Sequence, residues 1–151
     1  MPIAIILVAM VTLLGGWYSS ERMTQQNEAK LTSEAQAIAA NMLSYQRYIN
    51  DYVKYKDPAG DVPNYHYFQA FNGDAQDFIA QADAAGRAPG TMTWFKGPMP
   101  GVSAQINAGR LVLHYAPTSS ANASQRGVQA ELLRMTRGSY GVGKTVATPT
   151  P

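Results

Sequence analysis

The hydrophobic positions of this chain are concentrated at its N-terminus. No charged residue occurs from Pro2 to Tyr18, and the run from Ile3 to Leu14 is almost wholly apolar. A helix needs about 20 such residues to cross a bilayer, and Trp is enriched where the bilayer meets water. The pattern therefore predicts a transmembrane helix over residues 1–20. The anchoring side chains that we expect are Ile3, Ile6, Leu7, Leu13, Leu14 and Trp17.

Two other interpretations of this stretch are a cleaved signal peptide and a buried helix of a soluble protein. A signal peptide normally has Lys or Arg before the apolar run and small residues before the cleavage point. Here only the α-amino group precedes the run, and Trp17 and Tyr18 stand where small residues would be needed. We therefore favour a retained anchor. Glu21 and Arg22 nearly cancel, so charge does not fix the orientation; we expect the C-terminal side to lie outside the cytoplasm.

A second pattern predicts one long amphipathic helix in residues 21–57. No Pro or Gly occurs between Gly16 and Pro58, so the membrane helix can continue into this one as a single rod of roughly 55 residues, which Pro58 then ends. A heptad seam runs along this helix. Through the seam the helix can pair with a second copy, with a partner helix or with its own domain. The seam residues are Leu31, Ala35, Ile38, Met42, Tyr45, Ile49 and Tyr52.

Four tyrosines form a stripe on the same helix. Their spacings of three, four and three residues align them on one helical face beside Ile49. The stripe either packs onto the domain's own sheet or offers a partner surface, since Tyr combines a large contact area with a polar tip. With the seam, it supplies a candidate interface. Its members are Leu31, Ile38, Met42, Tyr45, Tyr48, Ile49, Tyr52 and Tyr55.

Residues 58–147 are expected to form one small domain, followed by a flexible tail at 148–151. Once the membrane helix is set aside, too few residues remain for two ordinary domains. An antiparallel hairpin is predicted at its centre, with residues 102–106 pairing with 110–115 across Asn107-Ala108-Gly109. The predicted fold class is therefore α+β: a transmembrane helix that continues into a long amphipathic helix, then a small domain with an antiparallel sheet and one or two packed helices.

Further strands are predicted from composition. Aromatic residues favour a strand from Tyr65 to Phe71, and β-branched and aromatic residues favour another from Thr91 to Phe95. Residues 140–147 are expected to return as an edge strand.

Two helices are predicted by capping signals and apolar spacing. Gly73-Asp74 starts a short helix that carries Phe78 and ends at the breaker Ala85–Gly90. A second helix covers residues 120–137, with Ser124 or Ser120 as its N-cap.

Composition narrows the function classes. A net charge of +2 with both signs interspersed gives no footprint for nucleic acid. The absence of cysteine excludes disulfides and thiolate metal sites. His66 and His114 lie far apart in sequence without clustered carboxylates, whereas a metal site needs three or four converging ligands. We expect no metal and no other cofactor.

Two motif matches fail on context. Gly138 to Thr145 fits the phosphate-binding loop G-x-x-x-x-G-K-[ST], but that loop must leave a buried strand and open a helix. Here a helical pattern precedes it and six residues ending in Thr-Pro-Thr-Pro follow. Gly16-Trp17 with Glu21 is similar to a prepilin peptidase site, but the apolar stretch precedes the cleavage point instead of following it. We therefore expect neither nucleotide binding nor processing as a pilin.

No catalytic constellation stands out. Serines occur, but none lies in a G-x-S-x-G turn. Asp74 and Asp77 could serve a membrane-tethered hydrolase as an acid pair, yet acids in a first helical turn are explained by the helix dipole. We expect a protein that is not an enzyme, with a tethered envelope hydrolase as the less favoured alternative.

Several segments together resemble one protein family. They are the N-terminal anchor ending at Gly15-Gly16-Trp17, the stretch from Asn41 to Arg47, the hairpin from Gly101 to Ala116, and the closing stretch from Gly138 to Lys144. In these segments, and in its length and element order, the chain resembles the PilM proteins of thin (type IVb) pilus operons on conjugative plasmids. These are distinct from the cytoplasmic actin-like protein that shares the name in other type IV pilus systems.

The resemblance implies a bacterial inner-membrane accessory protein of pilus biogenesis, and it brings no catalytic residues. We expect a single-pass scaffold with a periplasmic domain. Its expected partners are the bilayer, other pilus-assembly or envelope proteins and, through the long helix, a second copy of itself. A pilin-like structural subunit is the alternative.

Overall fold

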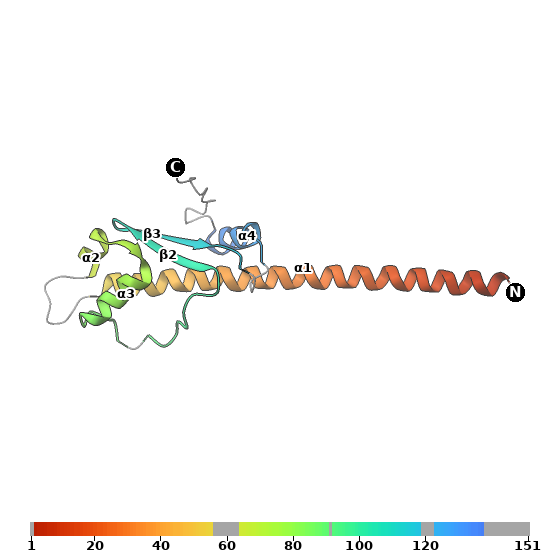
Figure 1. Cartoon of the computed structure of the whole chain (residues 1–151), viewed down its shortest axis with the longest axis horizontal. Helices are drawn as coiled ribbons and strands as arrows, with labels where there is room; N and C mark the ends of the chain where they lie inside the picture. The colour runs from red at the N-terminus through yellow and green to blue at the C-terminus, as the bar shows by residue number, and fades with distance from the viewer. Residues whose placement is uncertain (1, 56–63, 91, 119–122, 138–151) are drawn as a thin grey trace.

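The computed structural model describes residues 2–55, 64–90, 92–118 and 123–137, with side chains described from residue 25 onward. Its dominant element is α1 (Pro2–Lys54), a continuous helix of 53 residues. Figure 1 shows that the remaining elements gather around the C-terminal half of α1, while the N-terminal half projects beyond them. The predicted single rod is confirmed, and it ends three residues before Asp57.

The side chains of the predicted anchor, Ile3 to Trp17, lie outside the described ones. A search of the residues that are described finds no helix apolar enough over a sufficient length to span a bilayer. The transmembrane segment therefore stays a prediction.

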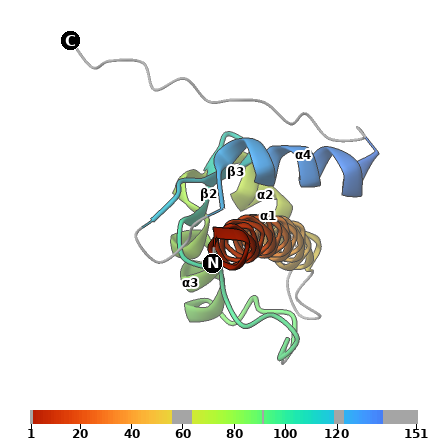
Figure 2. The ribbon, with the colours of Figure 1, turned by 90° about the vertical axis from the view of Figure 1, so that its right-hand side faces the viewer.

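Six short elements make up the head, by which we mean the part of the chain after α1. They follow in the order α2 (Asn64–Ala70), β1 (Asn72–Asp74), α3 (Ala75–Ala84), β2 (Val102–Asn107), β3 (Arg110–Tyr115) and α4 (Gln125–Thr136). The strands form an antiparallel sheet in the order β1-β2-β3. Viewed along α1, the sheet and α4 lie on one side of the helix, and the segment that leads from α3 to β2 passes the opposite side (Figure 2). The α+β class is confirmed.

The predicted hairpin is confirmed. Val102 pairs with Tyr115 and Asn107 with Arg110, so the turn is the two residues Ala108 and Gly109. Both have positive φ, 45° and 79°, as two-residue hairpins prefer because such turns match the twist of the strands. Alternate residues of β2 are buried, so one face of the sheet covers the core.

The predicted strand at Tyr65–Phe71 is wrong, because this segment is helix α2. Asn64 and Phe68, four residues apart, are both buried, whereas Tyr65 and Tyr67 are exposed. This burial follows the helical period and not the alternation of a strand. Aromatic content was therefore a poor guide here.

The strand predicted at 91–95 is also wrong over its described residues, which form an irregular segment. The chain just after it bonds to a side chain of α1 and not to another strand. Asn41 donates from Nδ2 to the carbonyl of Gly97 at 3.1 Å and accepts from the N–H of Met99 at 2.8 Å. Residues 92–99 are thereby held against α1 without a neighbouring strand.

Both predicted caps are observed. Asp74 precedes α3 and accepts a hydrogen bond from the N–H of Gln76 at 2.7 Å. Ser124 precedes α4 and accepts from the N–H of Gly127 at 3.1 Å, so α4 begins five residues later than residue 120. The predicted edge strand at 140–147, the tail at 148–151 and the motif at 138–145 lie outside the described residues.

Candidate functional site

The structure places the eight candidate interface residues along α1 in two environments. Five of them are buried inside the chain's own head: Ile38, Met42, Tyr45, Ile49 and Tyr52. Tyr48 and Tyr55 are half-buried, and Leu31 is 43% exposed. From Ala35 onward the seam is therefore part of the head's core, and only its first position faces solvent.

The tyrosine stripe packs mainly against α3 and residues 92–99. The ring of Tyr45 stacks on Phe95 at 5.2 Å between centroids, and Gln76 of α3 donates to its hydroxyl at 2.8 Å. Burial raises the pKa of Tyr45 to about 12. Tyr52 donates to a carboxylate oxygen of Asp83 at 2.9 Å. Burial is also the main cause that raises the pKa of Tyr52, and its hydrogen bonds to Tyr48 and Asp83 add to this.

One exposed aromatic residue stands at the edge of this stripe. Trp94 is 47% exposed, and its ring lies 6.0 Å from that of Tyr48 and 6.0 Å from that of Phe95. The sequence pattern assigned this residue to a strand and so missed that it would be presented at the surface.

A bare helical segment precedes the head. Residues 25–33 of α1 are all exposed, so no face of the helix is covered there. The head begins to cover α1 at Ala35, which is buried and lies against Gly127 of α4. We call residues 21–33 the stalk.

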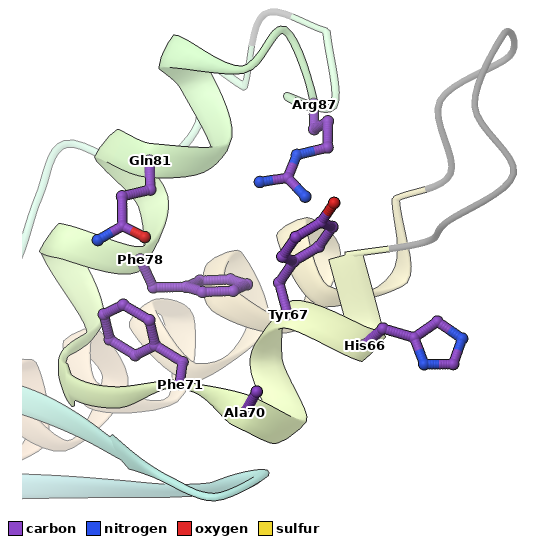
Figure 3. A pocket seen from close by; sticks show the side chains of 7 residues that line it. All are labelled: His66, Tyr67, Ala70, Phe71, Phe78, Gln81 and Arg87. Carbon is purple, nitrogen blue, oxygen red and sulfur yellow. The ribbon is translucent and has the colours of Figure 1, made fainter.

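A pocket of about 400 Å³ lies between α2 and α3. Figure 3 shows Phe71, Phe78 and Ala70 along its inner wall, with Gln81, Tyr67 and Arg87 around it, while His66 points away from the others. The Arg87 guanidinium lies over the Tyr67 ring, 3.5 Å from its centroid. This pocket combines an aromatic wall with one fixed cation.

The Arg87 side chain is short of acceptors. Its Nε and Nη1 are buried and have no hydrogen-bond partner. The backbone of Arg87 is held on both sides: its N–H donates to Ala82 at 2.8 Å, and its carbonyl accepts from the buried Asn64 at 2.8 Å. Sequence reasoning missed Arg87, because it stands inside a segment interpreted only as a helix breaker.

The remaining chemistry-bearing residues are dispersed. His66 lies on α2 and His114 on β3, and no group of three or more His, Cys, Asp or Glu residues in the described part of the chain could hold a metal ion. The carboxylate of Asp74 caps α3, and Asp77 lies in its first turn. Both acids thus occupy the structural positions that the sequence pattern indicated.

The comparisons with known proteins place the chain in a family. No curated protein and no solved structure matches it. The model of the PilM family matches residues 8–149, which is nearly the whole chain, including α1 from residue 8, the hairpin and α4. The chain therefore belongs to the PilM family, and it is a protein related to pilus biogenesis.

Proposed function

We propose that this protein is a membrane-anchored accessory or scaffold protein of a bacterial type IV (thin) pilus assembly, and that it acts through protein–protein contacts. The observation that carries this proposal is the division of α1. Its C-terminal half packs against the head, and its N-terminal half projects from it (Figure 1). A helix half without a head around it needs other surroundings, and lipid suits the sequence of residues 1–20.

The stalk separates the two ends. At 1.5 Å per residue, residues 21–33 raise the head by about 20 Å above the end of the anchor. The described stalk residues are mostly polar on every side, which is typical of a helix that crosses water between two structures. In this proposal residues 1–20 lie in the inner membrane and the head stands in the periplasm.

The proposed contacts with partners lie on exposed surfaces. Because Ile38, Tyr45 and Tyr52 are enclosed by the head, a partner helix cannot reach this part of the seam without opening the fold. Surfaces that remain open are the stalk with Leu31, the exposed ring of Trp94 and the pocket beside Arg87.

The anchor is tested by a matched pair of charge insertions in cells that lack the chromosomal or plasmid copy of the gene. Leu7→Arg puts a cation in the middle of the proposed span, where it costs about 2.5–3.5 kcal/mol. Leu31→Arg puts the same cation on the exposed stalk. We expect wild type and Leu31→Arg to stay with membranes in carbonate and to restore pili, and Leu7→Arg to do neither. A wild-type protein that washes off in carbonate would refute the anchor.

The scaffold role is tested by identifying the proteins that copurify with this one. Purification from solubilised membranes should recover pilus-assembly proteins in fixed proportion with wild type. A deletion strain that still assembles normal pili would refute the role itself, whatever the location of the protein.

The same division of α1 supports a second candidate, a pilin-like structural subunit, because the free half of the helix could pack against other copies inside a fibre. Sheared and purified pili separate the two candidates. A scaffold remains with the cells, whereas a structural subunit is present in the fibres in amounts comparable to the main pilin.

Catalysis by the acid pair forms no part of this proposal. Asp74→Asn with Asp77→Asn keeps a capping residue before α3, since Asn caps helices as well as Asp. The double variant should therefore fold and restore pili fully. Loss of pili with normal stability would instead indicate that the carboxylates act chemically.

A further inference from the structure

We propose that the pocket between α2 and α3 is a docking site for an acidic segment of a partner protein, in which an aromatic side chain enters the pocket and a neighbouring carboxylate bonds to Arg87. This inference rests on the proposed scaffold function and identifies one of its contact sites. It follows from the aromatic wall, the unsatisfied guanidinium and the size of the cavity.

The guanidinium is held in place before any partner arrives. The Tyr67 ring supports one face of it at 3.5 Å, and both ends of the Arg87 backbone unit are hydrogen-bonded. Fixing the side chain in advance reduces the entropy lost on binding. The Arg87 side chain is therefore preorganised to bind a ligand.

The buried guanidinium N–H groups of Arg87 lack an acceptor, and this favours binding of an anion. Guanidinium N–H groups removed from water and left unpaired carry a desolvation penalty. Among the described residues, no carboxylate pairs with Arg87, since the one ion pair is between Arg134 and Glu131 on α4. A carboxylate beside the guanidinium offsets this penalty through its charge. It reaches Arg87 at Nη2, the guanidinium nitrogen that is not among the buried ones, with a charge-assisted hydrogen bond.

The inner wall of the pocket selects an aromatic companion. Phe78 meets Phe71 edge-to-face at 5.5 Å and Phe68 at 5.9 Å, so the wall is a set of rings in fixed positions. A further ring gains the edge-to-face contacts that aromatic groups prefer. In Figure 3 the rings of Phe71 and Phe78 and the guanidinium face the same space.

The dimensions favour a side chain of a protein over a larger ligand. About 400 Å³ lies at the lower end of the range for ligand pockets, roughly 300–1,000 Å³, and accommodates one or two side chains. Gln81 at the rim offers amide groups to a partner backbone. A short aromatic–acidic segment uses all three features together.

The test measures binding of short peptides to the full-length protein in detergent by NMR titration. The probe is Ac-Gly-Phe-Glu-Gly-NH2, compared with the same peptide carrying Gln for Glu and with one carrying Ala for Phe. We expect each change to weaken binding about tenfold or more, since a charge-assisted hydrogen bond and a buried ring are each of that order. Acetate and inorganic phosphate at equal concentration should bind more weakly than the Phe-Glu peptide.

Arg87→Met keeps the apolar stem and removes the guanidinium. We expect it to bind the Glu and Gln peptides equally, while thermal unfolding shows that the head still folds. Arg134→Met is the control, because it removes an exposed arginine from α4 and should leave the Glu preference unchanged. If Arg87→Met unfolds the head, Gln81→Glu supplies the second variant, since a carboxylate at the rim should reduce binding of the Glu peptide selectively.

Three results would overturn the proposal: equal binding of the Glu and Gln peptides by wild type, phosphate or acetate binding as tightly as the peptide, or an undiminished Glu preference in Arg87→Met. None of these touches the scaffold role, which the deletion strain tests separately. Loss of pili in the deletion strain, together with a failed titration, would refute the pocket alone.

Discussion

Two positions of α1 that are equivalent in the heptad pattern are predicted to differ sharply in their effect on stability. Leu31 and Ile38 are seven residues apart on the same seam, yet Leu31 is 43% exposed and Ile38 is fully buried. We expect Ile38→Ala to destabilise the head strongly and Leu31→Ala to have almost no effect. The pair therefore measures where along α1 the seam is used by the chain's own fold.

The magnitude follows from burial. Ile38→Ala removes three buried carbon groups at ~0.8 kcal/mol each, about 2.4 kcal/mol in total. The cavity left behind raises the loss to about 3–4 kcal/mol, which lowers the melting temperature by roughly 12–25 °C for a domain of this size. At Leu31 no packed core is lost and Ala is the better helix former, so the change stays within about 0.5 kcal/mol.

The assay is guanidinium unfolding of the full chain in detergent, followed by tryptophan fluorescence. The chain has two tryptophans, and a Trp17→Phe background leaves Trp94, which lies in the aromatic cluster of the head. An equal loss at both positions would refute the reasoning, because it would mean that the seam packs in the same way along its whole length. A loss below about 1 kcal/mol at Ile38 would refute the placement of α1 inside the head.

Three further predictions concern single contacts in the head. Tyr52→Phe should make the free energy of unfolding fall less steeply above pH 10. The pKa of Tyr52 is raised in the folded state, so its contribution to stability is complete below its unfolded-state pKa near 10 and is lost as pH rises further. Urea midpoints measured between pH 7 and pH 11.5 would show this difference. Gly101→Ala should lower the free energy of unfolding by about 2 kcal/mol or more, because φ is +82° and the added Cβ overlaps a backbone carbonyl oxygen of the chain after β3. Gly90→Ala is the control, because a Cβ at that position meets nothing within 4 Å. The two variants are compared by melting temperature. Ser124→Ala should cost about 1 kcal/mol through loss of the α4 cap, measured by the same melts; an unchanged melting temperature would mean that this cap contributes nothing.

The elements that sequence predicted correctly are those whose signals are local. The rod of α1 follows from the absence of Pro and Gly between Gly16 and Pro58, and α3 and α4 follow from Asp74 and Ser124 at their starts. The hairpin follows from two apolar runs separated by a short turn that ends in Gly109. In each case the physical cause lies within a few residues of the structure that it produces.

The errors fall where a distant residue decides the backbone conformation. Residues 92–95 have the composition of a strand, but they lead into a segment whose Gly97 and Met99 bond to the side chain of Asn41, more than 50 positions earlier, and not to another strand. The helix α2 likewise depends on burial of Asn64, whose amide donates to the carbonyls of Tyr52 and Arg87. Propensity yields to such tertiary contacts because its own preferences are below about 1 kcal/mol per residue.

The heptad seam alone allows either a coiled coil with a partner helix or packing on the chain's own domain. The structure shows different surroundings for the seam in two parts of α1. Between Ala35 and Val53 one face of the helix packs against the head, and the buried apolar positions of that face lie within a single core. Residues 25–33 are exposed on every side and have only Leu31 as a large apolar residue, so two stalks brought together would bury little apolar surface. We therefore expect self-association through residues 25–54 of α1 to be weak. We therefore expect any strong pairing of copies to use residues N-terminal to the stalk or surfaces of the head, and the protein content of sheared pili shows whether such pairing builds a fibre.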